Sequence, residues 1–251
     1  MKFHMIRHAT VLLTYAGKKI LVDPMFSEKS SKPPVDHSAN TIKNPMVELP
    51  VTIESMLDID AIIVTHLHPD HFDDTAIESL PKNLPLFCQP NDSEIISNWG
   101  FKNVVPIQEF IEWNDICLIR TGGKHGKGEL AVNLGPVSGF ILQHVHEPSL
   151  YIVGDSIWCE DVSQALKKYH PKYAVINSGE ARFLEGGPIT MGIYDLEQML
   201  AFSPLLNIIA IHFETWNHCL LTRAEMRKYL SETKDKDRVW IPENGEILGF
   251  A

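Results

Sequence analysis

The 251-residue chain contains few cysteines, and none of the four belongs to a C-x-x-C pair. A disulfide framework or a zinc knuckle is therefore not indicated, and we expect free thiols. No apolar run approaches the roughly 20 residues that span a bilayer. The first residues also lack the apolar stretch and cleavage site of a secretory signal. We expect a cytoplasmic chain without a membrane partner.

Positive charge is also scarce, because 22 Lys and Arg face 32 Asp and Glu, for a formal net charge of −10. Nucleic acids and anionic membranes are captured by basic patches, so neither is expected as a partner. A small anionic substrate is still compatible with this charge, because bound cations can invert a local potential. No G-x-S-x-G motif is present, so a serine nucleophile elbow is not indicated. The sequence is silent on the oligomeric state.

The remaining composition, 44% hydrophobic and 22% charged, is typical of a globular enzyme with one sizeable core. We expect a single domain over residues 1–251. One irregular stretch, residues 27–50, contains a Ser-Ser-Lys-Pro-Pro run and two later prolines. It is long for a structureless connection, which leaves two alternatives: a lid or flap near the site, or a disordered surface insertion.

Local patterns predict an α/β fold. N-cap signals predict helices from Asp73 or Asp74 to Leu80, from Asn91 to Gly100 and from Thr222 to about Thr233, with two more at 161–168 and 195–201. Early strands follow one another without helices and later strands alternate with them, which indicates hairpins followed by a mixed, helix-covered sheet. Short apolar runs predict strands at 11–14, 20–22, 61–65, 116–120, 139–143, 150–153, 174–177 and 208–212.

The most informative segment is Thr-His-Leu-His-Pro-Asp-His at residues 65–71, directly after a buried strand. Side chains two apart on an extended chain point the same way, so His66 and His68 can face one ion. Asp70 and His71 lie past the strand end and can face a second one. Imidazoles and carboxylates are the usual ligands of zinc and similar cations. The alternative is a solvated polar loop, which rarely has this spacing.

Three more candidate ligands follow along the chain. His125 lies in a Gly-rich loop, 122–128, where a surface histidine is the alternative. Asp155 follows Gly154 after a strand, where a helix N-cap is the alternative. His212 ends an apolar strand, where an idle core histidine is the alternative.

Together these motifs resemble the metallo-β-lactamase superfamily, from His-x-His-x-Asp-His to the last His. The N-terminal stretches around His8 and Asp23 resemble its L-ascorbate-6-phosphate lactonase-like branch and, more distantly, N-acyl phosphatidylethanolamine phospholipase D. The resemblance implies a four-layer αββα sandwich with two metal ions. The first ion would be held by His66, His68 and His125, the second by Asp70, His71 and His212, with Asp155 between them.

A hydrolase of this family uses a hydroxide that bridges two divalent ions, with zinc preferred and manganese or iron acceptable. The resemblance implies that Asp70 also orients this hydroxide and passes on its proton. We therefore expect cleavage of a small ester, lactone or phosphodiester, with a small anionic lactone or phosphoester preferred. The alternatives are a di-metal redox protein and a nuclease of the same fold.

Six residues are candidates for supporting the ligands or contacting substrate, and for His8, Asp23, Trp216 and His218 the alternative is a purely structural role. His144 and His146 have the same H-x-H spacing as His66 and His68 but are not among these six. They precede Glu147-Pro148, where a solvated hairpin is the favoured interpretation. Arg182 could pair with a phosphate or carboxylate. The supporting candidates are His8, Asp23, Glu180, Arg182, Trp216 and His218.

Overall fold

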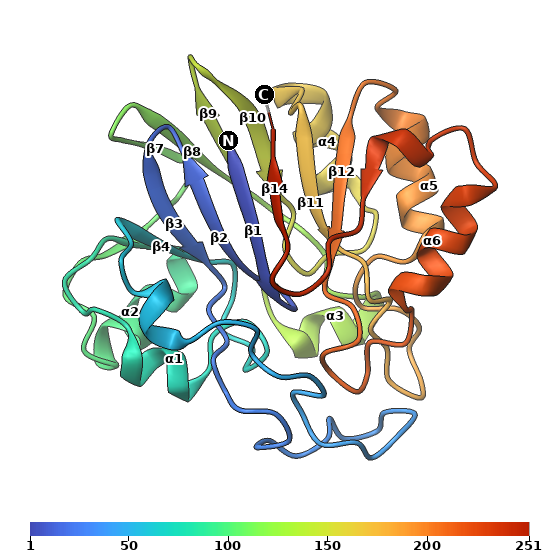
Figure 1. The fold of residues 1–251 in the computed structure, drawn as a ribbon, viewed down its shortest axis with the longest axis horizontal. Coiled ribbons are helices and arrows are strands. Elements are labelled where there is room, and N and C mark those ends of the chain that lie inside the picture. Colours follow the sequence, from blue (N-terminus) through green and yellow to red (C-terminus); the bar gives the residue numbers. More distant parts are fainter. Residues whose placement is uncertain (251) are drawn as a thin grey trace.

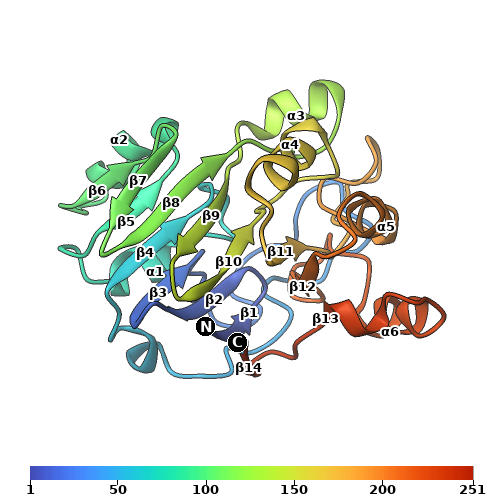
Figure 2. The same cartoon turned by 90° about the horizontal axis from the view of Figure 1, so that it is seen from above.

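The computed structural model describes residues 1–250 as two seven-stranded sheets stacked face to face, with helices on the outer sides (Figures 1 and 2). This four-layer αββα arrangement confirms the expected fold. The first sheet has the order β14-β1-β2-β3-β4-β5-β6 and the second has the order β13-β12-β11-β10-β9-β8-β7.

The strands of the first sheet are β1 (Lys2–Arg7), β2 (Thr10–Tyr15), β3 (Lys18–Val22), β4 (Ala61–Val64), β5 (Leu86–Cys88), β6 (Val104–Pro106) and β14 (Ile247–Gly249). Those of the second are β7 (Phe110–Trp113), β8 (Ile116–Thr121), β9 (Gly139–His144), β10 (Glu147–Ile152), β11 (Tyr173–Asn177), β12 (Asn207–Ile211) and β13 (Val239–Trp240). The α-helices are α1 (Asp74–Ser79), α2 (Ser93–Asn98), α3 (Gly128–Leu134), α4 (Glu160–Tyr169), α5 (Ile193–Phe202) and α6 (Arg223–Ser231), and 3-10 turns lie at Ile53–Met56, Pro90–Asp92 and Lys236–Arg238.

The direction of the strands determines where functional side chains gather. Strands β3 to β6 run parallel, as do β10 to β13, whereas β1 to β3 and β7 to β10 are antiparallel. The carboxyl ends of neighbouring parallel strands meet at one edge of a sheet, and binding loops concentrate there. In this molecule α3 and residues 27–50 lie at that end (Figure 1).

Three apolar layers hold the sandwich together. The central layer lies between the sheets and contains Leu13, Ile63, Phe140 and Ile209 among others. A second layer packs under α1 and α2, and a third packs under α4, α5 and α6. Strands β4 and β11 are buried along their whole length, which explains why both are continuous apolar runs.

All eight predicted strands are present, within three residues at their ends, and the largest difference is at β10, which begins at Glu147. The Thr222–Glu225 capping box starts α6, and the Asp73 carboxylate accepts from the Ala76 N–H at the start of α1. The Asn91 cap is wrong, because Pro90–Asp92 forms a 3-10 turn and α2 begins at Ser93 without a side-chain cap. Helix α3 was missed because it is short and buries none of its own residues fully, so its apolar pattern is weak.

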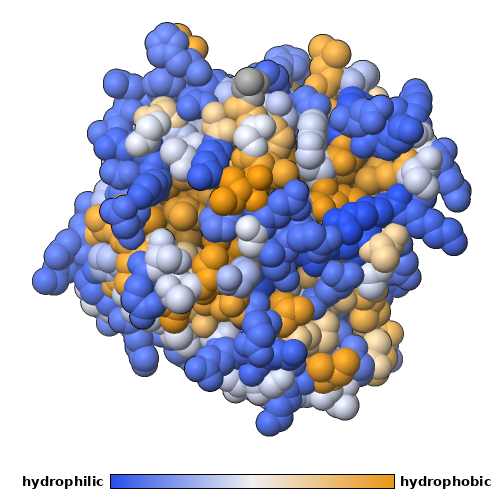
Figure 3. All heavy atoms as spheres, viewed as in Figure 1, coloured by the Kyte–Doolittle hydropathy of each residue, from blue (hydrophilic) through white to orange (hydrophobic). Residues whose placement is uncertain are grey.

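Residues 27–50 are fastened at both ends by Arg7, whose side chain is fully buried. Its guanidinium donates to the carbonyl oxygens of Met25, Ser27 and Val47 at 2.8–3.1 Å. These contacts count against the disordered alternative for the segment. The outer surface at this end is mainly hydrophilic with hydrophobic residues interspersed (Figure 3).

Two expectations from composition agree with the described residues. All four cysteines are free thiols. Across residues 1–250, every helix is too short or too polar to cross a lipid bilayer.

Candidate metal centre

The seven predicted ligands converge at the carboxyl edge of both sheets, although they come from four separate parts of the chain. Residues 66–71 follow β4, His125 follows β8, Asp155 follows β10 and His212 follows β12. The potential ligand atoms of His66, His68 and His125 lie within 4.8 Å of one another. The same holds for Asp70, His71 and His212 together with His8, and for His66, His71 and Asp155.

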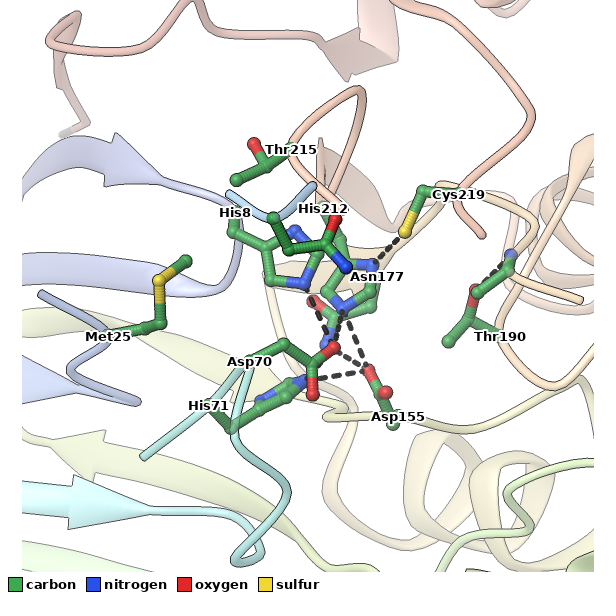
Figure 4. Close-up of polar contacts among 12 residues, drawn as sticks. His8, Met25, Asp70, His71, Asp155, Asn177, Thr190, His212, Thr215 and Cys219 are labelled. Carbon is green, nitrogen blue, oxygen red and sulfur yellow. Dashed lines mark hydrogen bonds and ion pairs between the residues drawn. The ribbon is translucent and has the colours of Figure 1, made fainter. Parts of the chain in front are cut away.

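The Asp155 carboxylate lies between the two groups and turns one oxygen toward each. Its Oδ2 is 3.6 Å from Nε2 of His125 and 4.0 Å from Nε2 of His66. Its Oδ1 is 3.3 Å from Nε2 of His71 and 3.5 Å from Nε2 of His212. A carboxylate with this arrangement can bridge two cations. Figure 4 shows Asp155 and Asp70 below the stacked rings of His8 and His212.

Several buried nitrogens at this centre have no hydrogen-bond partner among the described residues. They include the Nε2 atoms of His66, His71 and His212. Buried polar atoms are nearly always satisfied, so unsatisfied ones that converge on a point indicate a missing ligand. Three imidazole nitrogens directed at two carboxylates fit divalent transition-metal cations.

The second nitrogen of each ring is held by the protein, which orients the ring. Nδ1 of His71 donates to Oδ2 of Asp23 at 2.8 Å, and Nδ1 of His125 donates to the Ile189 carbonyl at 2.9 Å. Nε2 of His68 lies 3.0 Å from the Leu134 carbonyl, so the metal-facing nitrogen of His68 is Nδ1. Such partners set the tautomer of a ligand and raise its basicity.

The two remaining histidines have weaker partners. Nδ1 of His66 lies 3.1 Å from the Thr65 hydroxyl, and Nδ1 of His212 lies 3.5 Å from the Cys219 sulfur. Asn177 donates to Oδ1 of Asp155 at 2.6 Å. Thr65, Asn177 and Cys219 were not among the site residues predicted from the sequence. Asn177 ends a buried strand beside β10 and β12, and that position was the available signal.

Asp23, which follows β3, forms hydrogen bonds with two residues that follow the neighbouring strand β4. Besides His71, its carboxylate accepts from the backbone N–H and the hydroxyl of Thr65, both at 2.7 Å. Its backbone has a φ of 43°, in the left-handed region that non-glycine residues rarely adopt. Backbone strain of this kind is kept where surrounding contacts enforce it, often at functional sites.

His8 lies in the turn between β1 and β2 and is fully buried. Its Nε2 donates to Oδ2 of Asp70 at 3.1 Å, and its ring stacks on His212 with centroids 3.6 Å apart. The backbone carbonyl of His8 also accepts from the His212 N–H. His8 therefore positions both Asp70 and His212.

Burial and neighbouring charges set the protonation states. Burial lowers the pKa of His8, His66 and His125, which keeps these imidazoles neutral as metal binding requires. For Asp70 and Asp155, burial acts to raise the pKa, but His71 and the other imidazoles outweigh it and hold both carboxylates ionised. At His71 burial is outweighed by the surrounding carboxylates, which raise its pKa.

The remaining candidates from the sequence have different environments. Trp216 and His218 are buried, and burial lowers the pKa of His218 to about 4. Arg182 forms an ion pair with Glu180, so its charge is already compensated, and both side chains are partly exposed. His144 and His146 lie at the turn between β9 and β10, away from the centre.

An apolar cluster borders the centre, because Trp216 lies beside His8, Cys219 beside His212 and Ile189 beside His125. Its buried members are Met25, Ala181, Ile189, Trp216 and Cys219, and Val35, Leu130, Leu134 and Phe183 pack against them. We refer to these nine residues as the apolar cluster.

Replacing Asp23 by asparagine tests the support of His71. The substituted side chain would present an amide to Nδ1 of His71 and lose one charge, so we expect metal affinity to fall 10- to 100-fold. Isothermal titration of zinc into metal-free protein measures this. The Asp60→Asn variant, which changes a carboxylate hydrogen-bonded to Lys19 before β4, is the control. Equal zinc affinities in wild type and Asp23→Asn would contradict the assigned role.

Comparison with known proteins gives a consistent result. Residues 18–212 match the model of the Beta-lactamase superfamily domain. A protein of Bacillus subtilis, UPF0173 protein YddR, is 37% identical over the full length of both chains. The crystal structure of an isothiocyanate hydrolase from Delia radicum gut bacteria is 38% identical with a TM-score of 0.96, covering 100% of this chain and 99% of that one. A possible metal-dependent hydrolase from Veillonella parvula is 37% identical with a TM-score of 0.96, covering 99% and 98%.

Proposed function

Because the chain belongs to the β-lactamase superfamily and is a metal-dependent hydrolase of that fold, we propose that it hydrolyses small isothiocyanates at a dinuclear centre. The net reaction converts R–N=C=S and water into a primary amine and carbonyl sulfide. The water oxygen bonds to the central carbon, the nitrogen takes both protons, and the C–N bond breaks. The full-length likeness to an isothiocyanate hydrolase supports this substrate class.

The observation that carries the hydrolytic part of the proposal is the position of Asp155 between two groups of imidazoles. Two divalent cations, when bound, would supply a water of lowered pKa and a Lewis acid for the substrate. His66, His68 and His125 would hold one ion, and Asp70, His71 and His212 the other. Zinc suits these ligands best, and manganese or iron is also compatible.

Asp70 is the proposed proton carrier. Its Oδ2 is 3.1 Å from Nε2 of His8 and 3.7 Å from Nε2 of His212, so the carboxylate is held at the edge of the second group. An ionised carboxylate at this point can accept a proton from the attacking water and return it to the substrate nitrogen.

The surroundings favour a neutral substrate over the anionic lactone or phosphoester preferred from the resemblance. Ligand pockets that bind apolar groups are lined by aliphatic and aromatic side chains, as the apolar cluster provides. The side-chain cation that the sequence offered for an anionic substrate is not free to pair with one. Arg182, the cation selected from the sequence, is paired with Glu180.

A substrate panel tests the proposal. Purified protein is stripped with a chelator, reloaded with zinc, manganese or iron, and assayed with phenethyl isothiocyanate, a phenyl ester, a γ-lactone, bis(p-nitrophenyl) phosphate and single-stranded DNA. We expect metal-dependent release of phenethylamine, with kcat/KM at least about tenfold above the other substrates. Turnover of the ester, lactone or phosphodiester without turnover of the isothiocyanate would reject the substrate class.

We further propose that residues 27–50 act as a lid that Asn217 fastens. The Asn217 side chain accepts from the Val35 N–H and from Asn44, and donates to Ser38 and to the Asn40 carbonyl, at 2.6–2.9 Å. Its backbone N–H donates to Asn44 and its carbonyl accepts from Asn40. Asn217 lies between Trp216 and His218, so the lid and the residues beside the metal centre are held together.

Replacing Asn217 by alanine should release this lid. The four side-chain hydrogen bonds are lost, so we expect kcat/KM to fall about tenfold while metal content stays unchanged. Limited proteolysis should show new cleavage within residues 27–50. Asn207→Ala, at the far end of β12, removes one exposed hydrogen bond and should behave like wild type. An unchanged kcat/KM and cleavage pattern in Asn217→Ala would refute the lid.

A further inference from the structure

Two buried polar nitrogens beside the metal centre have no role in the ligand set described above. Nε1 of Trp216 and Nδ1 of His218 are both inaccessible and without a hydrogen-bond partner. Both residues are only 7% exposed. An indole N–H can only donate, and leaving it unpaired in the interior is costly, so such a group indicates an absent acceptor.

The two rings lie where the apolar cluster adjoins the metal centre, and Trp216 is itself a member of that cluster. The Trp216 ring is 6.3 Å from the His8 ring and 6.4 Å from the His218 ring. The His218 ring is in turn 6.2 Å from Phe183, which packs on the apolar cluster. A molecule bound where the metal centre adjoins the apolar cluster would therefore lie close to both nitrogens.

Their chemistry complements a neutral substrate with heteroatoms at its reactive carbon. The indole supplies one donor, and a neutral imidazole supplies one donor and one acceptor. Sites with buried hydrogen-bonding groups discriminate strongly, because a ligand without the matching atom leaves those groups unpaired. Apolar contacts alone discriminate much less.

We propose that Trp216 Nε1 and His218 Nδ1 form a polar subsite that binds the heteroatoms flanking the electrophilic carbon of the substrate, while the apolar cluster binds its apolar group. In an isothiocyanate the indole N–H would donate to the terminal sulfur and His218 would contact the nitrogen. The identity of the carbon rests on the proposed function. The subsite itself would bind any ligand with a thiocarbonyl or carbonyl acceptor beside an apolar group.

Trp216→Phe tests the indole nitrogen, because phenylalanine keeps an aromatic ring in the apolar cluster but has no N–H donor, and the apolar probe reports any effect of the smaller ring. Two stable probes are titrated calorimetrically into zinc-loaded protein: O-ethyl N-phenethylthiocarbamate, which has a thiocarbonyl, and n-butylbenzene, which does not. We expect the variant to bind the thiocarbamate about five- to tenfold more weakly and butylbenzene equally well. Trp240→Phe, which contacts Tyr173 and Phe250 in the central layer, is the control and should bind both probes normally.

His218 is tested with a conservative pair. His218→Phe removes both ring nitrogens, whereas His218→Asn keeps a polar atom close to the position of Nδ1. We expect thiocarbamate affinity to fall about fivefold in the first variant and to recover in part in the second. Circular dichroism melting of each variant checks that the fold is retained.

The outcomes separate the subsite from the proposed function. Equal thiocarbamate affinity in wild type, Trp216→Phe and His218→Phe overturns the subsite, as does an equal loss for both probes. If the affinities change as expected but phenethyl isothiocyanate is not hydrolysed with any metal, the subsite stands and the proposed substrate class fails.

Discussion

We expect the Asp155→Asn variant to lose metal-dependent hydrolysis, with kcat/KM at least about a thousandfold below wild type. The carboxylate oxygens face different imidazole groups, at 3.6 and 4.0 Å on one side and 3.3 and 3.5 Å on the other. An amide carries no charge, and its nitrogen is a poor ligand for divalent cations. Both metal positions should therefore weaken together, which is the specific consequence of a bridging position.

Elemental analysis after dialysis measures this directly. Wild type should retain up to two equivalents of metal per chain and Asp155→Asn much less than one. The double variant His144→Ala/His146→Ala is the matched control, because it removes a second H-x-H pair at the turn between β9 and β10. Loss of only one equivalent in Asp155→Asn, with substantial activity remaining, would show that Asp155 does not bridge.

The Asp70→Asn variant should have the second-largest effect, a fall in kcat of about 10²- to 10⁴-fold. The amide oxygen of the substituted side chain can still accept from His8 but cannot take a proton, so the reaction loses its proposed carrier. The effect should fall mainly on kcat, because the apolar cluster proposed to bind the substrate's apolar group is unchanged. Steady-state kinetics across a range of pH, with metal content measured in parallel, tests this expectation.

Two other variants separate proton transfer from ligation. His8→Phe keeps an aromatic ring on His212 but removes the nitrogen 3.1 Å from Asp70, so we expect a smaller loss of about tenfold at normal metal content. Asp58→Asn, which changes an exposed carboxylate, should have no effect. If supplying excess metal restored full activity to Asp70→Asn, Asp70 would be a ligand without a proton-transfer role.

Much of the metal centre could be predicted because most of its ligands are close in sequence or stand at clear strand ends. His66, His68, Asp70 and His71 lie within six consecutive positions after a buried strand, and Asp155 and His212 also follow strands. The carboxyl ends of neighbouring parallel strands lie at one edge of a sheet. A residue that follows such a strand can therefore be assigned to that edge from the sequence. Asp23, at the end of another strand, was a candidate for supporting a ligand, but the structure identified its imidazole partner as His71.

The contacts that orient the ligands could not be predicted in this way. His125 is held by the Ile189 carbonyl, 64 residues away, and His68 by the Leu134 carbonyl, 66 residues away. Every residue has a backbone carbonyl, so the identity of neither Ile189 nor Leu134 indicates the role. For Arg182 the residue type was misleading. A guanidinium suggested an anion-binding site, but in the structure its positive charge is paired with the Glu180 carboxylate.

The sequence by itself determined which residues can bind cations, in what order they occur, and that buried strands would carry them to one edge, since these properties depend on residue type and short-range spacing. Only the tertiary structure decided which oxygen of Asp155 faces which group of imidazoles, that Arg7 and Asn217 fasten residues 27–50, and that Trp216 and His218 keep unpaired nitrogens beside the metal centre. These features arise from contacts between distant segments, whose geometry is set by the packing of two sheets and is not encoded in any local pattern.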